Sequence, residues 1–289
     1  MRVMRPPKGY ASIGLLLVVA LCRMAVTASA NGITADAGLT PPVDRWIFRS
    51  QVRYMASGDD PTDMGREMKM YASPFVLAYG LRPNVTVIAR QIFYRSEMEM
   101  MAENSAETGV GDFFLLSKWR LLRINRRDFI IGIAPTIGVE APTGDRHFGS
   151  DTWDIVGGGY FTARRGPWGA DLNLEYKING IEDRGGGDRP GDEFTANLAL
   201  AYQFTLDKNA TMSLWPVIEV TYQDNRPDCS DGENVSDTGG NLLQVSPGLR
   251  FAHQSFMLEL LLQLPVRQNG NGAQLEREVG GLIGMRYLF

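Results

Sequence analysis

Apolar and polar residues alternate with a period of two along most of the chain. The stretch 168–179 shows the pattern well, with Trp168 and Leu172 on one face and Asp171 and Glu175 on the other. Such alternation is typical of β-strands that have one apolar face, and no helical period of useful length appears. The sequence therefore predicts an all-β fold.

Twelve segments show this alternation, and most run to about a dozen residues. Strands of soluble sheets average about 5–6 residues, whereas a tilted strand that crosses a bilayer needs about 9–11. The segments are 44–55, 68–80, 84–95, 110–123, 128–141, 151–164, 168–179, 192–206, 211–223, 241–252, 256–267 and 277–289. In the third segment, Gln91 shares a face with Val87 and Phe93, which indicates a bulge or a register shift there.

The links between the segments alternate in length. Links after odd-numbered segments are long, such as "DNRPDCSDGENVSDTGG", and links after even-numbered segments are short, such as "INRR" and "RGP". Outer-membrane barrels have an even strand number, short periplasmic turns and long outside loops, with aromatic belts at both interfaces. Because no strand edge can stay unpaired in hydrocarbon, we expect residues 44–289 to form a closed antiparallel transmembrane β-barrel of about 12 strands.

The first 30 residues have the features of an export signal. Basic residues precede the apolar stretch "IGLLLVVALC", which is too short to span a membrane, and "ASA" supplies small residues for cleavage. We expect residues 1–30 to be a cleaved signal peptide, so that the mature chain begins near Asn31. Residues 31–43 are not strand-like, and they are expected to form either a periplasmic tail or a small plug in the lumen.

Composition and charge narrow the function classes. The net charge of −4 is mild, so nothing indicates a nucleic-acid surface, which would need a basic excess. Cys229 is the one cysteine after the expected cleavage, so an intramolecular disulfide is not expected. Past the signal, no stretch of about 18 apolar residues offers a transmembrane helix. The protein is expected in the cell outer membrane, with lipids and lipopolysaccharide as its surroundings.

Charged residues of both signs fall on the predicted inward faces. Rings of one sign would indicate ion selectivity, whereas a mixture indicates cross-strand salt bridges that stiffen the barrel around a narrow or partly blocked passage. Arg49, Arg53 and Arg120 come first as solute contacts, since arginine suits anionic and aromatic solutes. The candidates for lumen and solute contact are Arg49, Arg53, Arg90, Lys118, Arg120, Glu140, Asp171, Glu175, Lys177, Glu219, Arg250 and Arg286.

The sequence predicts no catalytic, metal or cofactor site. His147 falls in a predicted outside loop and His253 in a predicted periplasmic turn, so no Ser–His pair can be built from them. The glycine-rich stretches "GVGDF" and "GGGD" precede no helix that would bind a phosphate. The acidic loop "DNRPDCSDGEN" has no EF-hand spacing. We therefore expect a protein that is not an enzyme and that holds no cofactor and no metal.

The last strand ends in an aromatic residue and must pair with the first strand to close the wall. It resembles the assembly signal of bacterial outer-membrane proteins, and Gly284, Tyr287 and Phe289 match the glycine, hydrophobic and aromatic positions of that signal. Leu282 departs from the usual polar first position. The resemblance implies that the outer-membrane assembly machinery is a partner, through the strand that ends at Phe289.

Four short motifs are distinctive: "GVGDFFLLSKWRLL" (109–122), "APTGD" (141–145), "RGPWGADLNLEYKIN" (165–179) and "VSPGLRF" (245–251). Together they resemble the bacterial outer-membrane family labelled MetA-pathway of phenol degradation. The likeness spans nearly the whole mature chain and implies a barrel that transports small molecules. The expected function is an outer-membrane channel for passive uptake of small solutes, with aromatic or hydrophobic ones as candidates. A sealed barrel that acts through its outside loops is the alternative, and a soluble exported β-sandwich is a third.

Overall fold

The computed structural model describes residues 30–101, 103–183 and 187–289, and its regular elements are β-strands. Residues 1–29, most of the expected signal peptide, lie outside this part. Within it, no helix is long and apolar enough to cross a membrane. The strands are β1 (Trp46–Gly58), β2 (Glu67–Arg82), β3 (Val85–Met100), β4 (Glu103–Val110), β5 (Phe113–Trp119), β6 (Leu122–Asn125), β7 (Phe129–Ala141), β8 (Asp154–Arg165), β9 (Trp168–Ile178), β10 (Glu193–Tyr202), β11 (Phe204–Thr205), β12 (Met212–Asn225), β13 (Cys229–Ser230), β14 (Glu233–Asn234), β15 (Gly240–His253), β16 (Phe256–Gly270), β17 (Glu276–Arg277) and β18 (Gly280–Leu288).

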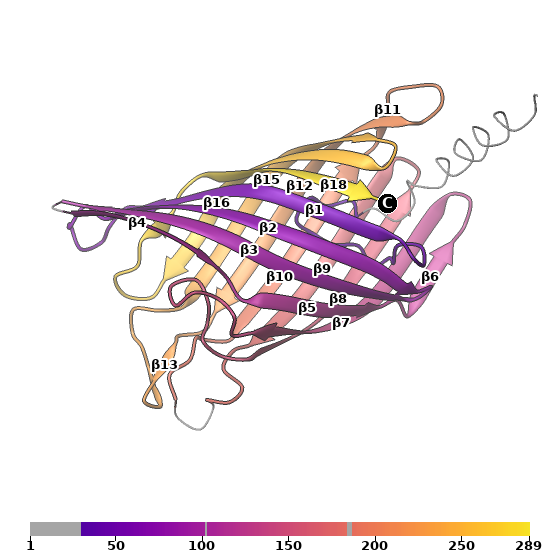
Figure 1. Ribbon diagram of the computed structural model, residues 1–289. Coiled ribbons are helices and arrows are strands. Elements are labelled where there is room, and N and C mark those ends of the chain that lie inside the picture. Colours follow the sequence, from indigo (N-terminus) through magenta and orange to yellow (C-terminus); the bar gives the residue numbers. More distant parts are fainter. Residues whose placement is uncertain (1–29, 102, 184–186) are drawn as a thin grey trace, which may run out of the picture.

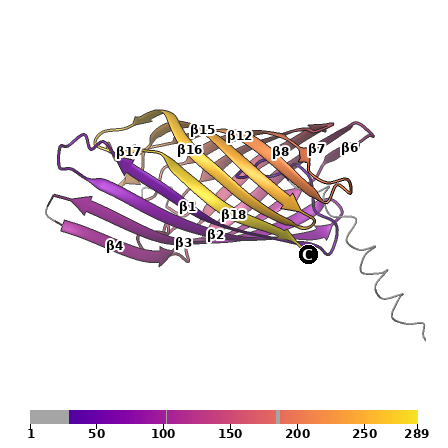
Figure 2. The ribbon, with the colours of Figure 1, turned by 90° about the horizontal axis from the view of Figure 1, so that it is seen from above.

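The strands of the main sheet close into a single ring, and Figure 1 shows the resulting barrel from the side. All but β13 and β14 belong to one 16-stranded sheet, in which every pairing is antiparallel. β4, β5 and β6 follow one another at one position of the wall, as do β10 and β11, and β17 and β18, so the wall has twelve strands. β1 pairs with β18, as Figure 2 shows, and β10 pairs with β12, so the twelve-strand ring is closed. The predicted closed antiparallel barrel is confirmed.

The predicted segments match the wall strands to within a few residues at most boundaries. The segment 168–179 corresponds to β9 (Trp168–Ile178), and 128–141 to β7 (Phe129–Ala141). The largest difference concerns the segment 110–123, because β4 already begins at Glu103. β4 pairs only with β3, so these two strands extend past the ring as a hairpin.

The irregularity predicted at Gln91 lies on the neighbouring strand instead. The β2–β3 register runs without a shift through Gln91, which is opposite Phe75. The ladder is interrupted between β4 and β5, at Gly111 and Asp112, and the Gln91 side-chain amide donates to the Gly111 carbonyl at 2.6 Å. The polar residue therefore sits on the outward face because it satisfies a carbonyl at this break.

The two faces of the wall separate as the alternation predicts. In β9 the Asp171 side chain points inward and is wholly buried, whereas Leu174 points outward and is 43% exposed. Aromatic pairs lie near both ends of the outward surface. Trp46 and Tyr79 have ring centroids 4.4 Å apart at one end, and Tyr54 and Tyr71 have centroids 5.3 Å apart toward the other.

The long links and the short turns lie at opposite ends of the barrel, here called the loop end and the turn end (Figure 1). The β13–β14 hairpin belongs to the link between β12 and β15, at the loop end. Phe289 lies at the turn end, where its backbone N–H and C=O bond to those of Trp46 at 3.0 and 2.9 Å.

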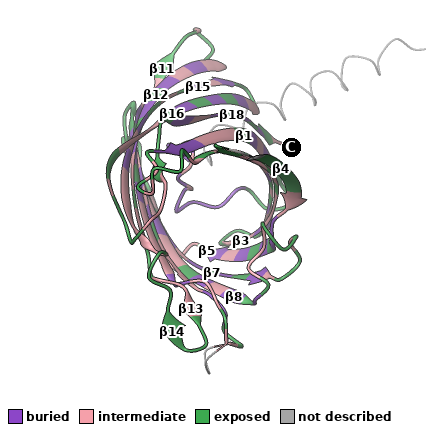
Figure 3. Cartoon of the chain, turned by 90° about the vertical axis from the view of Figure 1, so that its left-hand side faces the viewer, coloured by how far each residue is buried: buried purple, intermediate pink, exposed green. Residues whose placement is uncertain are grey.

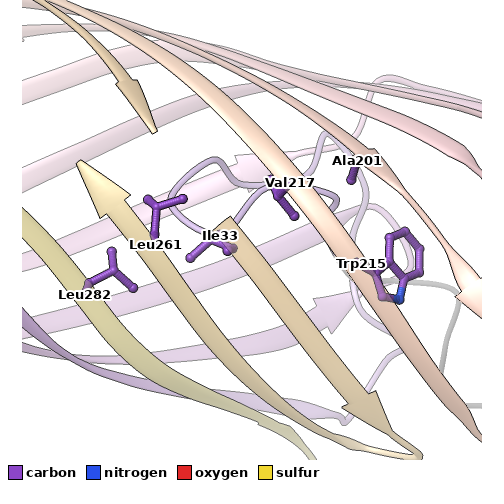
Figure 4. Packing of buried hydrophobic residues seen from close by; sticks show 6 residues of the cluster. All are labelled: Ile33, Ala201, Trp215, Val217, Leu261 and Leu282. Atoms are coloured by element: carbon purple, nitrogen blue, oxygen red, sulfur yellow. The ribbon is translucent and has the colours of Figure 1, made fainter. Parts of the chain in front are cut away.

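Residues 30–41, here called the inner segment, run through the ring as irregular backbone. Figure 3 shows buried chain crossing the interior. Nearly all of these residues are buried, and Ile33 is inaccessible to solvent. Ile33 packs into a cluster with five buried wall residues (Figure 4): Ala201, Trp215, Val217, Leu261 and Leu282.

Candidate channel lumen

A cavity of about 520 Å³ lies inside the barrel, on the loop-end side of the inner segment. Thr34 and Asp36 of the inner segment line it from the turn end, and Glu193, Gln223 and Arg277 line it toward the loop end. The remaining lining comes from the inward faces of the wall. Because those strands surround it, the cavity lies along the barrel interior.

One side of the cavity is apolar. Ile88, Phe114, Leu116 and Val156 are each less than 9% exposed and form one cluster, with Val76 packed against it. They come from β2, β3, β5 and β8, and the outward neighbours in β5 are apolar as well. Phe113 and Leu115 on the outer face thus back Phe114 and Leu116 on the inner face. This part of the wall presents hydrophobic surface to both sides.

The opposite side of the cavity is lined by amides and hydroxyls. These groups come from β9, β10, β12, β15 and β16, which form a continuous part of the ring that begins beside β8. They are Asn173, Thr195, Asn197, Thr221, Gln223, Gln244 and Gln263. Amides and hydroxyls donate and accept hydrogen bonds without carrying charge. The cavity is therefore amphipathic in cross-section.

Six of the twelve predicted residues line this cavity, namely Arg49, Arg53, Arg90, Glu140, Glu175 and Lys177. Three of the six form a network. Glu140 lies 3.3 Å from Arg90 and 2.5 Å from Lys177, which also lies 3.0 Å from Asp154. Glu175 accepts a hydrogen bond from the Tyr160 hydroxyl at 2.5 Å.

The two arginines nearest the apolar side differ in their partners. Arg90 pairs with Glu140 and lies over the Phe114 ring, 4.3 Å from its centroid. Arg53 donates from Nε and Nη2 to the Gln51 side-chain oxygen at 3.0 and 2.8 Å. Among the described residues, no carboxylate lies within 4.0 Å of the Arg53 guanidinium. Arg53 thus offers a positive charge that its nearest partner does not neutralise.

The other six predicted residues do not line the cavity, and five of them bind the inner segment. Lys118 donates to the Ala37 carbonyl at 2.9 Å, and Arg120 donates to the Thr40 hydroxyl at 2.8 Å. Asp171 and Glu219 accept hydrogen bonds from backbone N–H groups of residues 31–34, and Arg250 donates to the carbonyls of residues 30–32. Arg120, which is predicted as one of the first solute contacts, binds the inner segment in this structure.

The sixth, Arg286, belongs to a buried ion cluster with Arg250 and Glu259. Arg250 Nε lies 3.0 Å and Arg286 Nη2 lies 3.2 Å from Glu259 Oε1. Arg286 is also directly opposite Arg49 in the β1–β18 register. Asp36 of the inner segment, 3.7 Å from Arg49, supplies a second negative charge there. Like charges on neighbouring strands are thereby compensated by acidic groups from two other elements.

The sequence interpretation missed the apolar side of the cavity and the role of Asp36. The signal for the first was the run "FFLLSKW" in β5, where apolar residues occupy both faces. The signal for the second was a hidden alternation in the inner segment, where Ile33, Ala35, Ala37 and Leu39 are buried between more polar residues. The predicted candidates are charged residues of the predicted strands, a set that includes neither the apolar residues nor Asp36.

A second hollow of about 340 Å³ lies at the loop end, between the links that follow β1 and β16. Asp60 accepts hydrogen bonds from Arg66 Nε and Nη2 at 3.0 and 2.7 Å, and Arg66 Nη2 also donates to the Ala273 carbonyl at 3.1 Å. The Arg66 guanidinium holds the pKa of the Asp60 carboxyl well below its usual range. This contact ties the two links together over the barrel mouth.

The histidines lie far from each other, as the loop assignment predicts. His147 is in the long link after β7, where Nδ1 contacts Glu107, and His253 ends β15 beside a short turn. Within the described ranges, no three His, Cys, Asp or Glu side chains gather as metal ligands would. The lumen offers charged and apolar surfaces to a small molecule.

Comparison with solved structures finds similar proteins. The COG4313 outer membrane channel from Pseudomonas putida F1 is 16% identical, with a TM-score of 0.66 over 89% of this chain and 100% of that one. The β domain of the Bordetella autotransporter BrkA is 8% identical, with a TM-score of 0.49 over 85% of this chain and 100% of that one. The likeness to the COG4313 channel shows that the fold is that of an outer-membrane barrel.

Sequence comparison gives the family. No curated protein matches the chain. A family model described as "Putative MetA-pathway of phenol degradation" matches residues 71–268, which run from β2 into β16. The match spans well over half of the chain and contains all four motifs on which the resemblance rested. The chain therefore belongs to this MetA-pathway of phenol degradation family.

Proposed function

We propose that the protein is an outer-membrane channel through which small solutes, aromatic or hydrophobic ones among them, enter passively. The amphipathic cavity carries this proposal. Its apolar side suits a ring or an alkyl group, and Arg53 and Arg90 suit a negative group or a π-face. A volume of about 520 Å³ is within the range of pockets that hold one small organic molecule.

Passage through such a cavity needs no chemistry from the wall. A solute can move along the apolar side while its polar group passes from one hydrogen-bonding amide to the next, so it meets no deep binding minimum. Conduction requires that binding be weak enough for release. The uncharged amides of β9, β10, β12, β15 and β16 suit this exchange. The protein would then act as a selective passage and not as an enzyme.

The same proposal includes export and assembly. Residues 1–30 would be removed as a signal peptide, and the barrel would be inserted by the outer-membrane assembly machinery through the strand that ends at Phe289. Lipopolysaccharide and lipids would then surround the outward face. Support comes from the apolar outward positions and from the aromatic pairs at both ends of the wall.

One observation favours a second candidate, a sealed barrel that acts through its outside loops. The inner segment fills the turn-end part of the lumen, and five wall residues hold it there. If the segment never moves, the cavity is a closed pocket. The long acidic link between β12 and β15 would then be the functional surface.

Solute flux separates the two candidates. Purified protein is reconstituted in liposomes, and swelling is measured in benzoate and in a pentose of similar size. The channel proposal expects faster swelling in benzoate than in the pentose, with the Phe114→Ser variant reducing the difference. Liposomes that contain folded protein and swell in neither solute would support the sealed barrel and contradict the channel.

A further inference from the structure

Asn31 occupies a tightly fitted site at the turn end of the lumen. It is wholly buried, and its side-chain amide donates to the Ala170 carbonyl at 3.2 Å and to Asp171 Oδ1 at 2.9 Å. Its side-chain oxygen accepts from Arg164 Nε at 2.8 Å. Gly169 makes room for it, since a Cβ there would clash with the Asn31 side-chain oxygen. Both polar atoms of the Asn31 side chain therefore have hydrogen-bond partners.

Two wholly buried carboxylates face the same short stretch of chain. Asp171 Oδ2 accepts from the backbone N–H groups of Asn31 and, at 3.0 Å, Gly32, while Oδ1 accepts from the Thr162 hydroxyl at 2.6 Å. Glu219 accepts from the N–H of Ile33 at 2.5 Å and from that of Thr34 at 3.0 Å. Backbone N–H groups stabilise an anion but do not neutralise it.

Neither carboxylate has a cation in direct contact within the part of the chain that the structure describes, because no lysine or arginine nitrogen lies within 4.0 Å of Asp171 or Glu219. Arg164 attracts Asp171, and Arg49 and Arg250 attract Glu219, only over a longer range. Burying an ionised carboxylate without an opposite charge is costly, and buried charges in proteins are generally paired. The remaining contacts of Asp171 point to one atom that could carry such a charge, namely the backbone nitrogen of Asn31.

We propose that this part of the lumen is a binding site for the protein's own mature N-terminus, with the α-ammonium of Asn31 forming a buried ion pair with Asp171. The inference rests on the part of the proposed function in which residues 1–30 are removed. In that step an export signal peptidase hydrolyses the Ala30–Asn31 peptide bond. The water oxygen goes to the Ala30 carbonyl carbon as a carboxylate, and the Asn31 nitrogen leaves as an amine and is protonated.

The contacts that remain after cleavage keep the new terminus in place. Arg250 loses the Ala30 carbonyl but retains the Asn31 carbonyl at 3.2 Å and that of Gly32. The Asn31 side chain keeps Ala170, Asp171 and Arg164. The hydrogen bond from Asn31 N to Asp171 becomes charge-assisted, which roughly doubles the strength of such a bond. Processing thus strengthens the attachment of the inner segment to the wall.

The test measures the start of the chain and the reactivity of its α-amine. Protein extracted from outer membranes is analysed by N-terminal mass spectrometry, and the folded barrel is acylated with an amine-reactive reagent and mapped by peptide. We expect a chain that starts at Asn31, whose α-amine reacts at least about tenfold more slowly than in the Asp171→Asn variant, where the buried ion pair is broken. Lys208, exposed in a short turn, reports reagent activity in every sample.

Two further variants separate loss of the ion pair from loss of the fold. Gly169→Ala keeps both carboxylates but displaces the Asn31 side chain, so it is also expected to expose the α-amine. Asp112→Asn alters a buried carboxylate that accepts from Thr143, Gly144 and Ser150 and does not touch the inner segment, so protection is expected to persist. The heat-dependent mobility of each variant in detergent gels shows whether its barrel is folded.

The proposal is overturned if the outer-membrane protein starts at another residue. It is equally overturned if the Asn31 amine of folded wild-type protein reacts as fast as in the Asp171→Asn and Gly169→Ala variants. These results are independent of solute flux. A protected α-amine in a barrel that passes no solute would contradict the channel alone, and a reactive α-amine in a conducting barrel would contradict the N-terminal site alone.

Discussion

Arg53 and Arg90 both present a guanidinium group to the cavity, but only one of the two is paired with a carboxylate. Glu140 neutralises Arg90 and shares its charge with Lys177, whereas Arg53 is held by the neutral side chain of Gln51. Charges that are paired at close range exert little field at a distance. Arg53 is therefore the residue whose charge a solute in the cavity would feel most.

Replacing Arg53 with glutamine keeps most of the side-chain length and removes the charge. We expect the anion-to-cation permeability ratio of the reconstituted channel to fall about threefold, because roughly 0.6 kcal/mol of Coulomb attraction is lost in a lumen screened by salt. Reversal potentials in a salt gradient across a planar bilayer measure this ratio. The effect should shrink as the salt concentration rises.

Arg95→Gln is the matched control for this measurement. Arg95 is on the same strand as Arg90, but its side chain is 57% exposed and pairs with Glu97 outside the cavity. We expect its reversal potential to equal that of the wild type. A similar shift in both variants would mean that surface charge, and not the cavity, sets the preference.

The buried ion cluster gives a second prediction at the residue scale. Arg250→Ala leaves Glu259 with Arg286 alone and removes the donors to residues 30–32, so we expect the free energy of unfolding to fall by about 3–5 kcal/mol. Arg45→Ala, which alters an exposed side chain at the turn end, should change it by less than about 0.5 kcal/mol. Urea unfolding in detergent micelles measures both.

A double-mutant cycle with Glu259→Ala checks the cause of that loss. Because the two residues form one buried pair, the double variant should be less destabilised than the sum of the single variants, by about 0.5–3 kcal/mol. Additive losses would mean that Arg250 stabilises the barrel through the inner segment alone.

At the scale of elements, the inner segment is an irregular stretch that the barrel encloses. It is bound through its backbone N–H groups and carbonyls by residues of β5, β9, β12 and β15. Side chains that bind backbone fix the path of a segment irrespective of most of its sequence. The wall strands therefore bind residues 30–41 much as a protein binds a ligand. Because the strands pair with one another and not with this segment, removing it is expected to leave a complete barrel.

Deleting residues 31–41 tests this at the level of conductance. The chain then resumes at Pro42, next to β1, and we expect single-channel conductance to rise severalfold, because the turn-end part of the lumen becomes water-filled. Deleting residues 228–237, which carry the β13–β14 hairpin at the loop end, removes a similar length of chain outside the ring and should leave conductance nearly unchanged. Equal conductance in the wild type and the 31–41 deletion would show that the segment does not limit flow.

The sequence could predict the strands because alternation and hydrocarbon exposure act on each strand separately. Asp171 and Leu174 already show their faces within β9, and a one-residue slip would turn the acidic residue outward. The sequence could not predict which wall residues contact irregular backbone such as the inner segment. Gln91 satisfies a carbonyl on a neighbouring strand, and Arg120 binds Thr40, so both depend on contacts between positions far apart in the chain. Charge patterns identified inward residues but not their partners.

At the scale of the whole molecule, closure joins the last residue to the first strand. Trp46 and Phe289 exchange two backbone hydrogen bonds, and the Tyr287 and Phe289 rings are stacked with centroids 5.7 Å apart. An antiparallel ring has one seam between its ends, so a fault there opens an edge, whereas a fault elsewhere is supported on both sides. Terminal changes should consequently cost more than similar changes within the wall.

Removing Phe289 is expected to lower the free energy of unfolding by about 1–3 kcal/mol, through the loss of two backbone hydrogen bonds at the seam. Refolding into lipid vesicles should also slow, and the slowly migrating unfolded form should persist in unheated detergent gels. Phe204→Ala removes another turn-end aromatic, which is 50% exposed and contacts Tyr202, without touching the seam. If that variant refolds as slowly as the Phe289 deletion, the aromatic belt rather than closure limits assembly.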